Sequence, residues 1–289
     1  MNPFHKGERA VQEAAGVRAM ADRVGGIIGD TIPSGARVWL LSQRLIAVAA
    51  LAPDERVWAQ LLSGEPGFGC APDERTLRVR ASLTPDDPLR ASLEHGADVG
   101  AIVIEPSKRR RLRFNGRAHL ADDVLSIHAR EVYSNCPQYI QARSPREAAP
   151  RSAPVLVAQG SELGAAERAW IAEADTFFIG STHAQSGADC SHRGGNPGFV
   201  SVEGNALRWP DYEGNAMFNT LGNLVLDGRA GLVFPDWQSG GALQLAGQAR
   251  LASEGDGRRV EFEVSAWRHV AGVLPASWLF GSYSPSNPR

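Results

Sequence analysis

The stretch Leu62-Ser-Gly-Glu-Pro-Gly-Phe68 returns 131 residues later as Arg193-Gly-Gly-Asn-Pro-Gly-Phe199. In both stretches two glycines, a proline and a phenylalanine stand in the same places, and such residues form turns. Further matches at this offset, without any gap, are Trp39 with Trp170, Leu93 with Leu224, Gly100 with Gly231, and Leu112, Gly116 and Ala118 with Leu243, Gly247 and Ala249. Shared turns and shared packing positions predict that one folding unit occurs twice in the chain.

The chain has 289 residues, which suggests about two domains. Its net charge of -2 gives no electrostatic reason to expect nucleic acid or an anionic membrane as a partner. No apolar run approaches the roughly 18 residues of a membrane span, and the charged N-terminal region lacks the apolar centre of a secretory signal. The three cysteines are widely spaced and the seven histidines lack metal-ligand spacing. We therefore expect a cytoplasmic protein without a metal site.

Both copies show the same order of short apolar strands separated by turns, after a helix that carries the matched tryptophan. The expected strands include residues 45–48, 77–80, 100–104 and 112–116 in the first copy and 176–179, 206–209, 231–234 and 243–247 in the second. More strands than helices predict a mainly β (α+β) protein, with a small closed barrel and an outer helix in each copy.

Domain boundaries follow from composition. The segment 142–154, ARSPREAAPRSAP, is rich in Pro, Ser, Ala and Arg and has no apolar periodicity, so it is expected to be an extended linker. The two copies then occupy residues 1–141 and 155–289. Before the first copy, residues 8–24 have apolar side chains near helical spacing, which predicts an amphipathic N-terminal helix on the first barrel.

Several long, ordered motifs resemble predicted flavin-nucleotide-binding proteins related to pyridoxamine 5'-phosphate oxidase, including the two-copy members of that group. The motifs are ADCSHRGGNPGFV at 188–200, WPDYEGNAMFNTLGNL at 209–224, AGLVF at 230–234, LQLAGQA at 243–249, FHKGERAVQ at 4–12, YSNCPQYIQ at 133–141 and YSPSNP at 283–288. The resemblance implies two tandem split β-barrels that form a pseudo-dimer. It also implies FMN at their interface, with the phosphate held by one barrel and the ring bordered by the other.

The candidate phosphate site lies in the second copy. Ser191 and Arg193 are two apart on an expected strand, so a hydroxyl and a guanidinium share one face, and guanidinium geometry suits phosphate. Asn219, Thr220 and Asn223 lie at the start of an expected helix, where free backbone N–H groups favour an anion. By the resemblance, Asn219 and Thr220 stand where the oxidases have a phosphate-binding Arg and Lys, which leaves more of the binding to Arg193.

The repeat separates this reading from a structural one, in which Asn219 and Thr220 only cap a helix and Arg193 pairs with Asp189. The first-copy counterparts of Ser191, Arg193, Asn219, Thr220 and Asn223 are Gln60, Leu62, Pro88, Leu89 and Ser92. A structural role predicts similar residues in both copies, yet only the turn residues are kept. We therefore predict that the second copy holds the phosphate and that the first covers the flavin ring.

Four other features are weaker signals. Trp209 and Gln244 complete the candidate flavin-binding set, Trp209 because it precedes the phosphate cluster and could flank the isoalloxazine. The basic run Lys108–Arg113 is interpreted as a solvated hairpin turn, with a docking patch for an acidic partner or a nucleotide phosphate as the alternative. Cys190 and His192 lie on the strand face opposite Arg193 and are expected inside the barrel.

A bound flavin carries hydride and electron chemistry itself, so no nucleophile or catalytic triad is required, and the sequence contains neither GxSxG nor a P-loop. The Arg-x-His element with which the oxidase holds its substrate is also missing near the C-terminus, which argues against that activity. The leading hypothesis is an FMN-dependent oxidoreductase of unknown small-molecule substrate. The alternatives are an F420-dependent reductase, a flavin carrier that needs a partner reductase, and a structural protein with an empty pocket. Monomer and homodimer both remain open.

Overall fold

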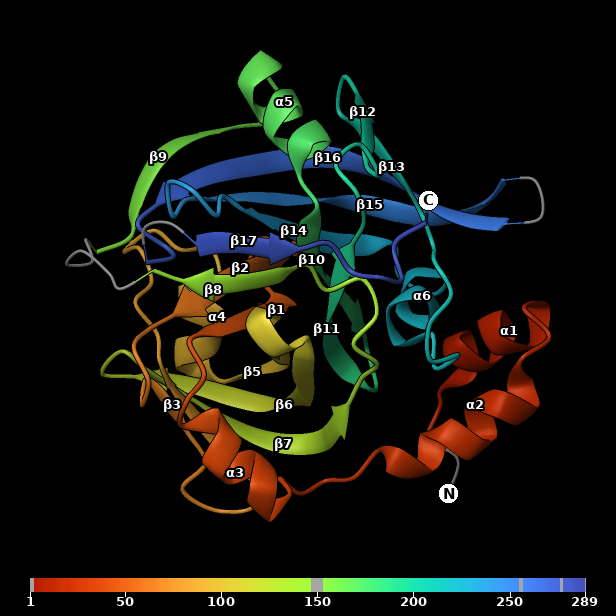
Figure 1. The fold of residues 1–289 in the computed structure, drawn as a ribbon, viewed down its shortest axis with the longest axis horizontal. Coiled ribbons are helices and arrows are strands. Elements are labelled where there is room, and N and C mark those ends of the chain that lie inside the picture. The colour runs from red at the N-terminus through yellow and green to blue at the C-terminus, as the bar shows by residue number, and fades with distance from the viewer. Residues whose placement is uncertain (1–2, 147–152, 255–256, 276–277, 289) are drawn as a thin grey trace.

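The computed structural model describes residues 3–146, 153–254, 257–275 and 278–288, which form mainly antiparallel β-structure (Figure 1). The first sheet contains β1 Leu45–Leu51, β2 Val57–Ser63, β3 Gly69–Cys70, β4 Thr76–Arg80, β5 Ala97–Glu105, β6 Arg110–Ala121 and β7 Val124–Ser134. The second contains β9 Val155–Gly160, β10 Thr176–His183, β11 Gly187–Gly194, β12 Ser201–Glu203, β13 Ala206–Pro210, β14 Arg229–Pro235, β15 Ala242–Glu254 and β16 Gly257–Ala271. The expected mainly β fold class is confirmed.

The two sheets have the same strand order, β2-β1-β5-β6-β7-β4-β3 and β11-β10-β14-β15-β16-β13-β12. Their hydrogen-bond registers also correspond, because Leu45 faces Ser63 in the first sheet and Thr176 faces Gly194 in the second. Even the bulges match, one after Asn115 and the other after Ala246. The offset of 131 residues therefore holds at the level of individual strand pairs.

The helices are short and lie outside the sheets. They are α1 Lys6–Ala14, α2 Arg18–Val24, α3 Ser34–Leu40, α4 Arg90–His95, α5 Ala165–Glu173 and α6 Asn219–Leu224, with 3-10 turns at Gly25–Ile27 and Pro106–Lys108. The matched tryptophans lie on α3 and α5, as the repeat predicts. Of the helices in the described ranges, none has the length and apolarity needed to traverse a lipid bilayer.

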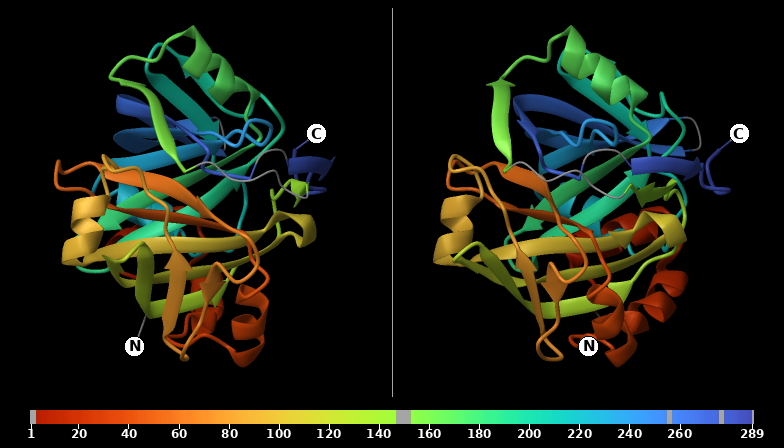
Figure 2. Two further views of the ribbon diagram at one scale, coloured as in Figure 1. Left: turned by 90° about the vertical axis from the view of Figure 1, so that its left-hand side faces the viewer. Right: turned by 60° about the vertical axis from the view of Figure 1, so that its left-hand side comes forward.

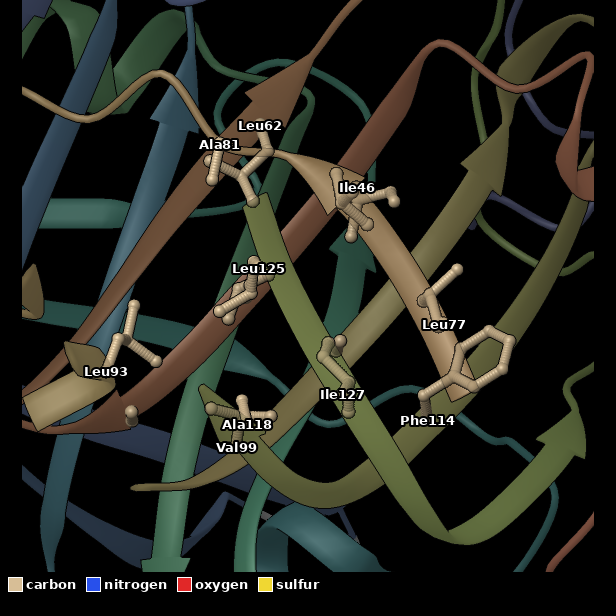
Figure 3. Close-up of a cluster of buried hydrophobic side chains, with 14 of the residues drawn as sticks. Ile46, Leu62, Leu77, Ala81, Leu93, Val99, Phe114, Ala118, Leu125 and Ile127 are labelled. Atoms are coloured by element: carbon tan, nitrogen blue, oxygen red, sulfur yellow. The ribbon is translucent and has the colours of Figure 1, made fainter. Parts of the chain in front are cut away.

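Each sheet curls around its own apolar core. In the first, alternate residues of β4, β6 and β7 point inward, among them Leu77, Phe114 and Ile127, all fully buried (Figure 3). In the second, Phe177, Trp209 and Phe262 lie at the centre. This alternation is what a strand with one buried face requires, so the period-two pattern sets the register in both halves.

A third apolar cluster joins the two sheets, which lie against each other in Figure 2, the first in orange to lime and the second in green to blue. Strand β5 contacts β11, and β14 makes the corresponding contact with β2. Glycines allow this approach. A Cβ on Gly100 would overlap the backbone of Asp189 and Cys190, and a Cβ on Gly231 would lie 2.6 Å from the carbonyl oxygen of Val57. The matched glycines therefore mark two equivalent close crossings.

We expect Gly100→Ala to lower the free energy of unfolding by about 1–3 kcal/mol, because the added methyl overpacks a backbone crossing that cannot move easily. Urea unfolding measures the change. The control is Gly26→Ala, because a Cβ at Gly26 would have no neighbour within 4 Å. Equal stability of the two variants would contradict the close crossing.

The N-terminal segment differs from the single helix predicted on the first barrel. It forms two helices, α1 and α2, with a break at Gly16, whose φ is +68°. Helix α1 lies on α6 of the second half, where Gly7 and Gly222 bring the two helices together (Figure 1). Helix α2 continues toward the first sheet, and Gly29 forms a β-bridge with Val132. The segment thus contacts both halves.

The predicted linker 142–154 is also not irregular throughout. Its first four residues form β8 Ala142–Pro145, which pairs with β17 Trp278–Ser282 near the C-terminus. Residues 147–152 lie outside the described residues. Backbone hydrogen bonding to β17 gives β8 partners that composition alone does not reveal.

Candidate functional site

A cavity lies where the two halves meet, and segments from both line it. The first half contributes β6 and residues 135–139, and the second contributes β11 and residues 210–221. Its volume is about 110 Å³. Pockets that enclose a drug-sized ligand measure roughly 300–1,000 Å³, so this cavity can enclose only a small chemical group.

The floor of the cavity is a buried ion pair that crosses between the halves. The Arg113 guanidinium on β6 lies 2.9 Å from a carboxylate oxygen of Asp189 on β11. Arg113 also donates to the Tyr133 hydroxyl at 2.9 Å and to the Ser191 hydroxyl. Burial lowers the pKa of Arg113, but Asp189 and Tyr133 more than offset this and raise it above its ordinary value. Arg113 therefore stays charged and fixes the two halves in register here.

The polar side chains of α6 belong to the same network. Thr220 Oγ1 donates to Asp189 at 2.9 Å and lies 2.8 Å from Ser191 Oγ. Asn219 accepts from Arg113 at 3.2 Å and donates to Glu8 of α1 at 2.7 Å. These groups line the cavity, but their hydrogen bonds are directed to protein atoms. These side chains therefore define the shape of the cavity and do not supply an unpaired charge to it.

Free positive charge comes from two other arginines. Arg111 on β6 and Arg193 on β11 line the cavity, and neither forms an ion pair with a carboxylate of the described residues. The nearby carboxylates are engaged, since Asp189 pairs with Arg113 and Asp211 lies 3.0 Å from Arg258. The Nε of Arg111 is buried without a hydrogen-bond partner. Two guanidiniums without counterions form a site that favours an anion.

The electrostatics of these groups point the same way. Burial, followed by repulsion from Arg113 and Arg193, lowers the pKa of Arg111 to about 9. The pKa of Arg193 is lowered mainly by burial as well. Burial is thus the main cause of both shifts, although Asp211 and Asp189 act on Arg193 in the opposite direction.

His192 adds a neutral donor to the cavity. Burial, then Arg111 and Arg193, lowers its pKa well below the ordinary value, so the imidazole is neutral near pH 7. Nδ1 lies 3.2 Å from Arg111 Nη1, which can only donate, so Nδ1 accepts and the proton is assigned to Nε2. Nε2 is buried without a partner. It is therefore a buried donor whose hydrogen-bonding capacity is not met by any of the described residues.

The outer wall of the cavity is aromatic and strained. Tyr139 and Tyr212 place their ring centroids 5.0 Å apart, and the Tyr139 hydroxyl donates to the carbonyl of Glu213 at 2.9 Å. Tyr139, Ala216 and Phe218 all have φ between 60° and 63°. Non-glycine residues in this region are held there only by their surroundings, and they gather at functional sites.

Four of the seven predicted site residues meet at this cavity, namely Ser191, Arg193, Asn219 and Thr220. Three do not line it. Trp209 is buried in the second core, with its ring centroid 5.1 Å from that of Phe177. Asn223 hydrogen bonds to Ser181 and His5 on the inner side of α6, and the side chain of Gln244 is buried away from the cavity. These three residues lie in or near the motifs, but their side chains point away from the cavity.

The contribution of the first half was predicted only as the alternative for the basic run, a docking patch for a nucleotide phosphate. Arg111 and Arg113 belong to the basic run that was interpreted as a solvated turn, yet Arg113 is buried and Arg111 half-buried at the cavity. The available signal was alternation, because Leu112 and Phe114 are core residues and their neighbours must face the other side. Cys190 and His192 also differ from expectation. Cys190 belongs to the cluster between the sheets, since the face opposite Arg193 meets the first half.

Glu8 couples α1 to this site and makes stability depend on pH. Burial outweighs its hydrogen bonds from His5 and Asn219 and raises its pKa from 4.5 to about 8. Between these values the folded protein holds a proton that the unfolded chain releases. The free energy of unfolding contributed by Glu8 therefore falls as pH rises from about 4.5 to 8.

We expect Glu8→Gln to remove the pH dependence that Glu8 gives to the free energy of unfolding. The free energy of unfolding of the variant should exceed that of the parent by about 1–3 kcal/mol at pH 8.5 and by little at pH 5, because the glutamine stays neutral at both pH values. Urea unfolding at the two pH values measures it. Glu13→Gln, at an exposed position of the same helix, should follow the parent. A gain that does not change with pH would refute the shift.

No family model matches the sequence, and no curated protein matches it. Solved structures that resemble part of it include HupZ of group A Streptococcus, with 13% identity, a TM-score of 0.29 and coverage of 36% of this chain and 94% of that one. A Clostridium acetobutylicum protein of the pyridoxinephosphate oxidase family has 9% identity and a TM-score of 0.28, with coverage of 39% of this chain and 89% of that one. The FAD binding protein of Mycobacterium smegmatis has 15% identity and a TM-score of 0.26, with coverage of 39% of this chain and 98% of that one. The case for a function therefore depends on the residues of this chain.

Proposed function

We propose that the protein binds a flavin nucleotide, FMN, with its phosphate between Arg111 and Arg193 in the cavity at the junction of the halves. The observation that carries this proposal is the pair of guanidiniums without a counterion, beside the unpartnered N–H of His192. A phosphate dianion satisfies both cations, and a guanidinium can donate two parallel hydrogen bonds to it. The sequence motifs that resemble flavin-nucleotide-binding proteins overlap the same segments.

The arrangement of the halves fits a pseudo-dimer of two split barrels, residues 1–141 and 155–289. In this arrangement the second half supplies Arg193 and the shaping residues Ser191 and Thr220, and the first half supplies Arg111 and Arg113. The proposal differs here from the prediction made from the sequence, because the first half would provide phosphate ligands as well as cover the ring. Tyr139 and Tyr212 stand at the open side, where a flavin ring that extends from the phosphate would lie.

A single site per chain follows from the asymmetry of the repeat. The first-half counterparts of Ser191 and Arg193 are the buried residues Gln60 and Leu62. On the opposing strand, Gln244 and Ala242 stand where the proposed site has Arg113 and Arg111. The corresponding space thus lacks every guanidinium of the proposed site. We expect one flavin per polypeptide.

A bound flavin would supply hydride and electron transfer, which makes an oxidoreductase with a small-molecule substrate the best-supported activity. The residues of this chain would bind the phosphate, orient the ring and exclude water. Arg111 and Arg193 provide positive charge, and neutral His192 can donate a hydrogen bond from Nε2 without changing its protonation near pH 7.

The direct test is titration of the purified protein with FMN, riboflavin and F420, followed by flavin fluorescence or absorbance. We expect saturation at one FMN per chain and much weaker binding of riboflavin, which lacks the phosphate. Turnover of NADH or NADPH by the FMN-loaded protein alone would support an oxidoreductase, and turnover only with an added reductase would support a carrier. Binding of neither FMN nor F420 would refute the proposal.

A further inference from the structure

A second, larger cavity adjoins the first. Its volume is about 530 Å³, within the range of pockets that hold small molecules. It lies on the first half, between α3 and the hairpin of β6 and β7. Arg111 and Asn135 line both cavities, so the two are separated by little more than these side chains.

The wall of the second cavity combines an apolar, aromatic face with positive charge. Ile27, Pro33, Ala36, Trp39 and Val132 form the apolar part, and the charged residues at its edge are Lys108, Arg109, Arg110 and Arg111. No Asp or Glu of the described chain lines it. The Arg110 guanidinium lies over the Trp39 ring, 5.4 Å from its centroid, which holds a cation next to a flat apolar surface.

Only some of the side chains in this wall are held by hydrogen bonds to the rest of the protein. Trp39 is anchored by a hydrogen bond of 2.7 Å from Nε1 to Glu105, and Arg109 is committed to the backbone of Ile140 and Tyr283. Lys108 pairs with Glu105 at 2.8 Å, whereas neither Arg110 nor Arg111 forms an ion pair with a carboxylate of the described residues. The Oδ1 atom of Asn135 is buried without a partner as well.

The second half shows that the fold does not require these cations. At the offset of 131 residues Trp39 becomes Trp170, but the run Lys108–Arg111 becomes Ser-Gly-Gly-Ala at 239–242. The second half thus forms the same strand pair without a cation at any of these four positions, so packing alone does not explain the cations of the first half.

We propose that the second cavity binds a planar aromatic ligand that carries an anionic group such as a carboxylate, sulfonate or phosphate. Its ring lies against Trp39 and its charge is met by Arg110 and Arg111. Binding of this ligand does not depend on a flavin. Only its role as the second substrate, placed beside the flavin through Arg111, rests on the proposed function.

The test compares two probes with the flavin-free protein, 1-anilinonaphthalene-8-sulfonate and N-phenyl-1-naphthylamine, which has the same ring system without the sulfonate. We expect the sulfonate to bind more tightly. Arg110→Gln should weaken its binding about tenfold and leave the neutral probe unchanged, as expected for loss of one charge-assisted contact. Arg110 is exposed, so this variant should fold normally.

Matched variants localise the effect. Trp39→Leu should weaken both probes, whereas Trp170→Leu and Arg78→Gln, which alter the second half and an exposed site elsewhere, should weaken neither. Equal affinity for the two probes, or no effect of Arg110→Gln, would overturn the proposal. Displacement of the sulfonate by FMN would also overturn it, because the second cavity would then be part of the flavin site. Sulfonate binding in a protein that refuses FMN would refute the proposed function alone.

Discussion

The double variant Arg111→Leu, Arg193→Leu should bind FMN about a thousandfold more weakly than the parent protein. Each guanidinium contributes a charge-assisted contact to the phosphate of about 2 kcal/mol, and a loss of about 4 kcal/mol corresponds to that factor. Fluorescence titration measures it. Arg193→Leu reproduces the residue of the first half, Leu62, and Arg111 is only half-buried, so the fold should survive both substitutions.

Riboflavin is the internal control for this result. Because it has the ring but no phosphate, its weaker binding should be almost unaffected by the two substitutions. An equal loss for FMN and riboflavin would place the ring, not the phosphate, at the guanidiniums. Unchanged FMN affinity would remove the phosphate site from this cavity.

Arg113→Leu should lower the free energy of unfolding by about 3–5 kcal/mol, because it leaves Asp189 buried without its counterion. The matched control is Arg130→Leu. Its ion pair with Asp98 has a similar length, 3.1 Å, but lies at the surface, where such a pair is worth less than about 1 kcal/mol. Urea unfolding of both variants gives the comparison.

A second substitution distinguishes loss of the charge pair from loss of packing. In the Arg113→Leu background, Asp189→Asn should restore part of the lost stability, because the buried site then holds no unpaired charge. If Asp189→Asn only adds to the loss, the Arg113–Asp189 pair is not the source of the effect.

The topology was largely predictable from sequence, and the side-chain environment less so. Matched glycines and alternating apolar residues specify turns, bulges and which strand face is buried, and these features are local. Trp209 was misplaced because a tryptophan next to polar motif residues can face either side of a strand, and here the core takes it. Arg113 was missed because its partner, Asp189, comes from the other half, and no pattern within the first half reveals that carboxylate.

The N-terminal segment was hard to predict for a related reason. Its apolar spacing correctly indicated helix, but amphipathicity says only that one face is covered, not by what. The face of this helix is covered by α6 through the contact between Gly7 and Gly222, which are more than two hundred positions apart in the sequence.

The unequal halves have a consequence for how such a protein can change over generations. When two identical chains assemble, one nucleotide change alters both sites at once, so neither can be abandoned without harm to the other. A fused tandem gene escapes this constraint. At the place equivalent to the proposed site, Leu62 and Leu89 are buried, and Arg268 of the second half lies 3.1 Å from Asp86 of the first. In such a tandem chain, one copy can therefore acquire contacts that only stabilise the fold, while the other keeps the residues of the proposed binding site.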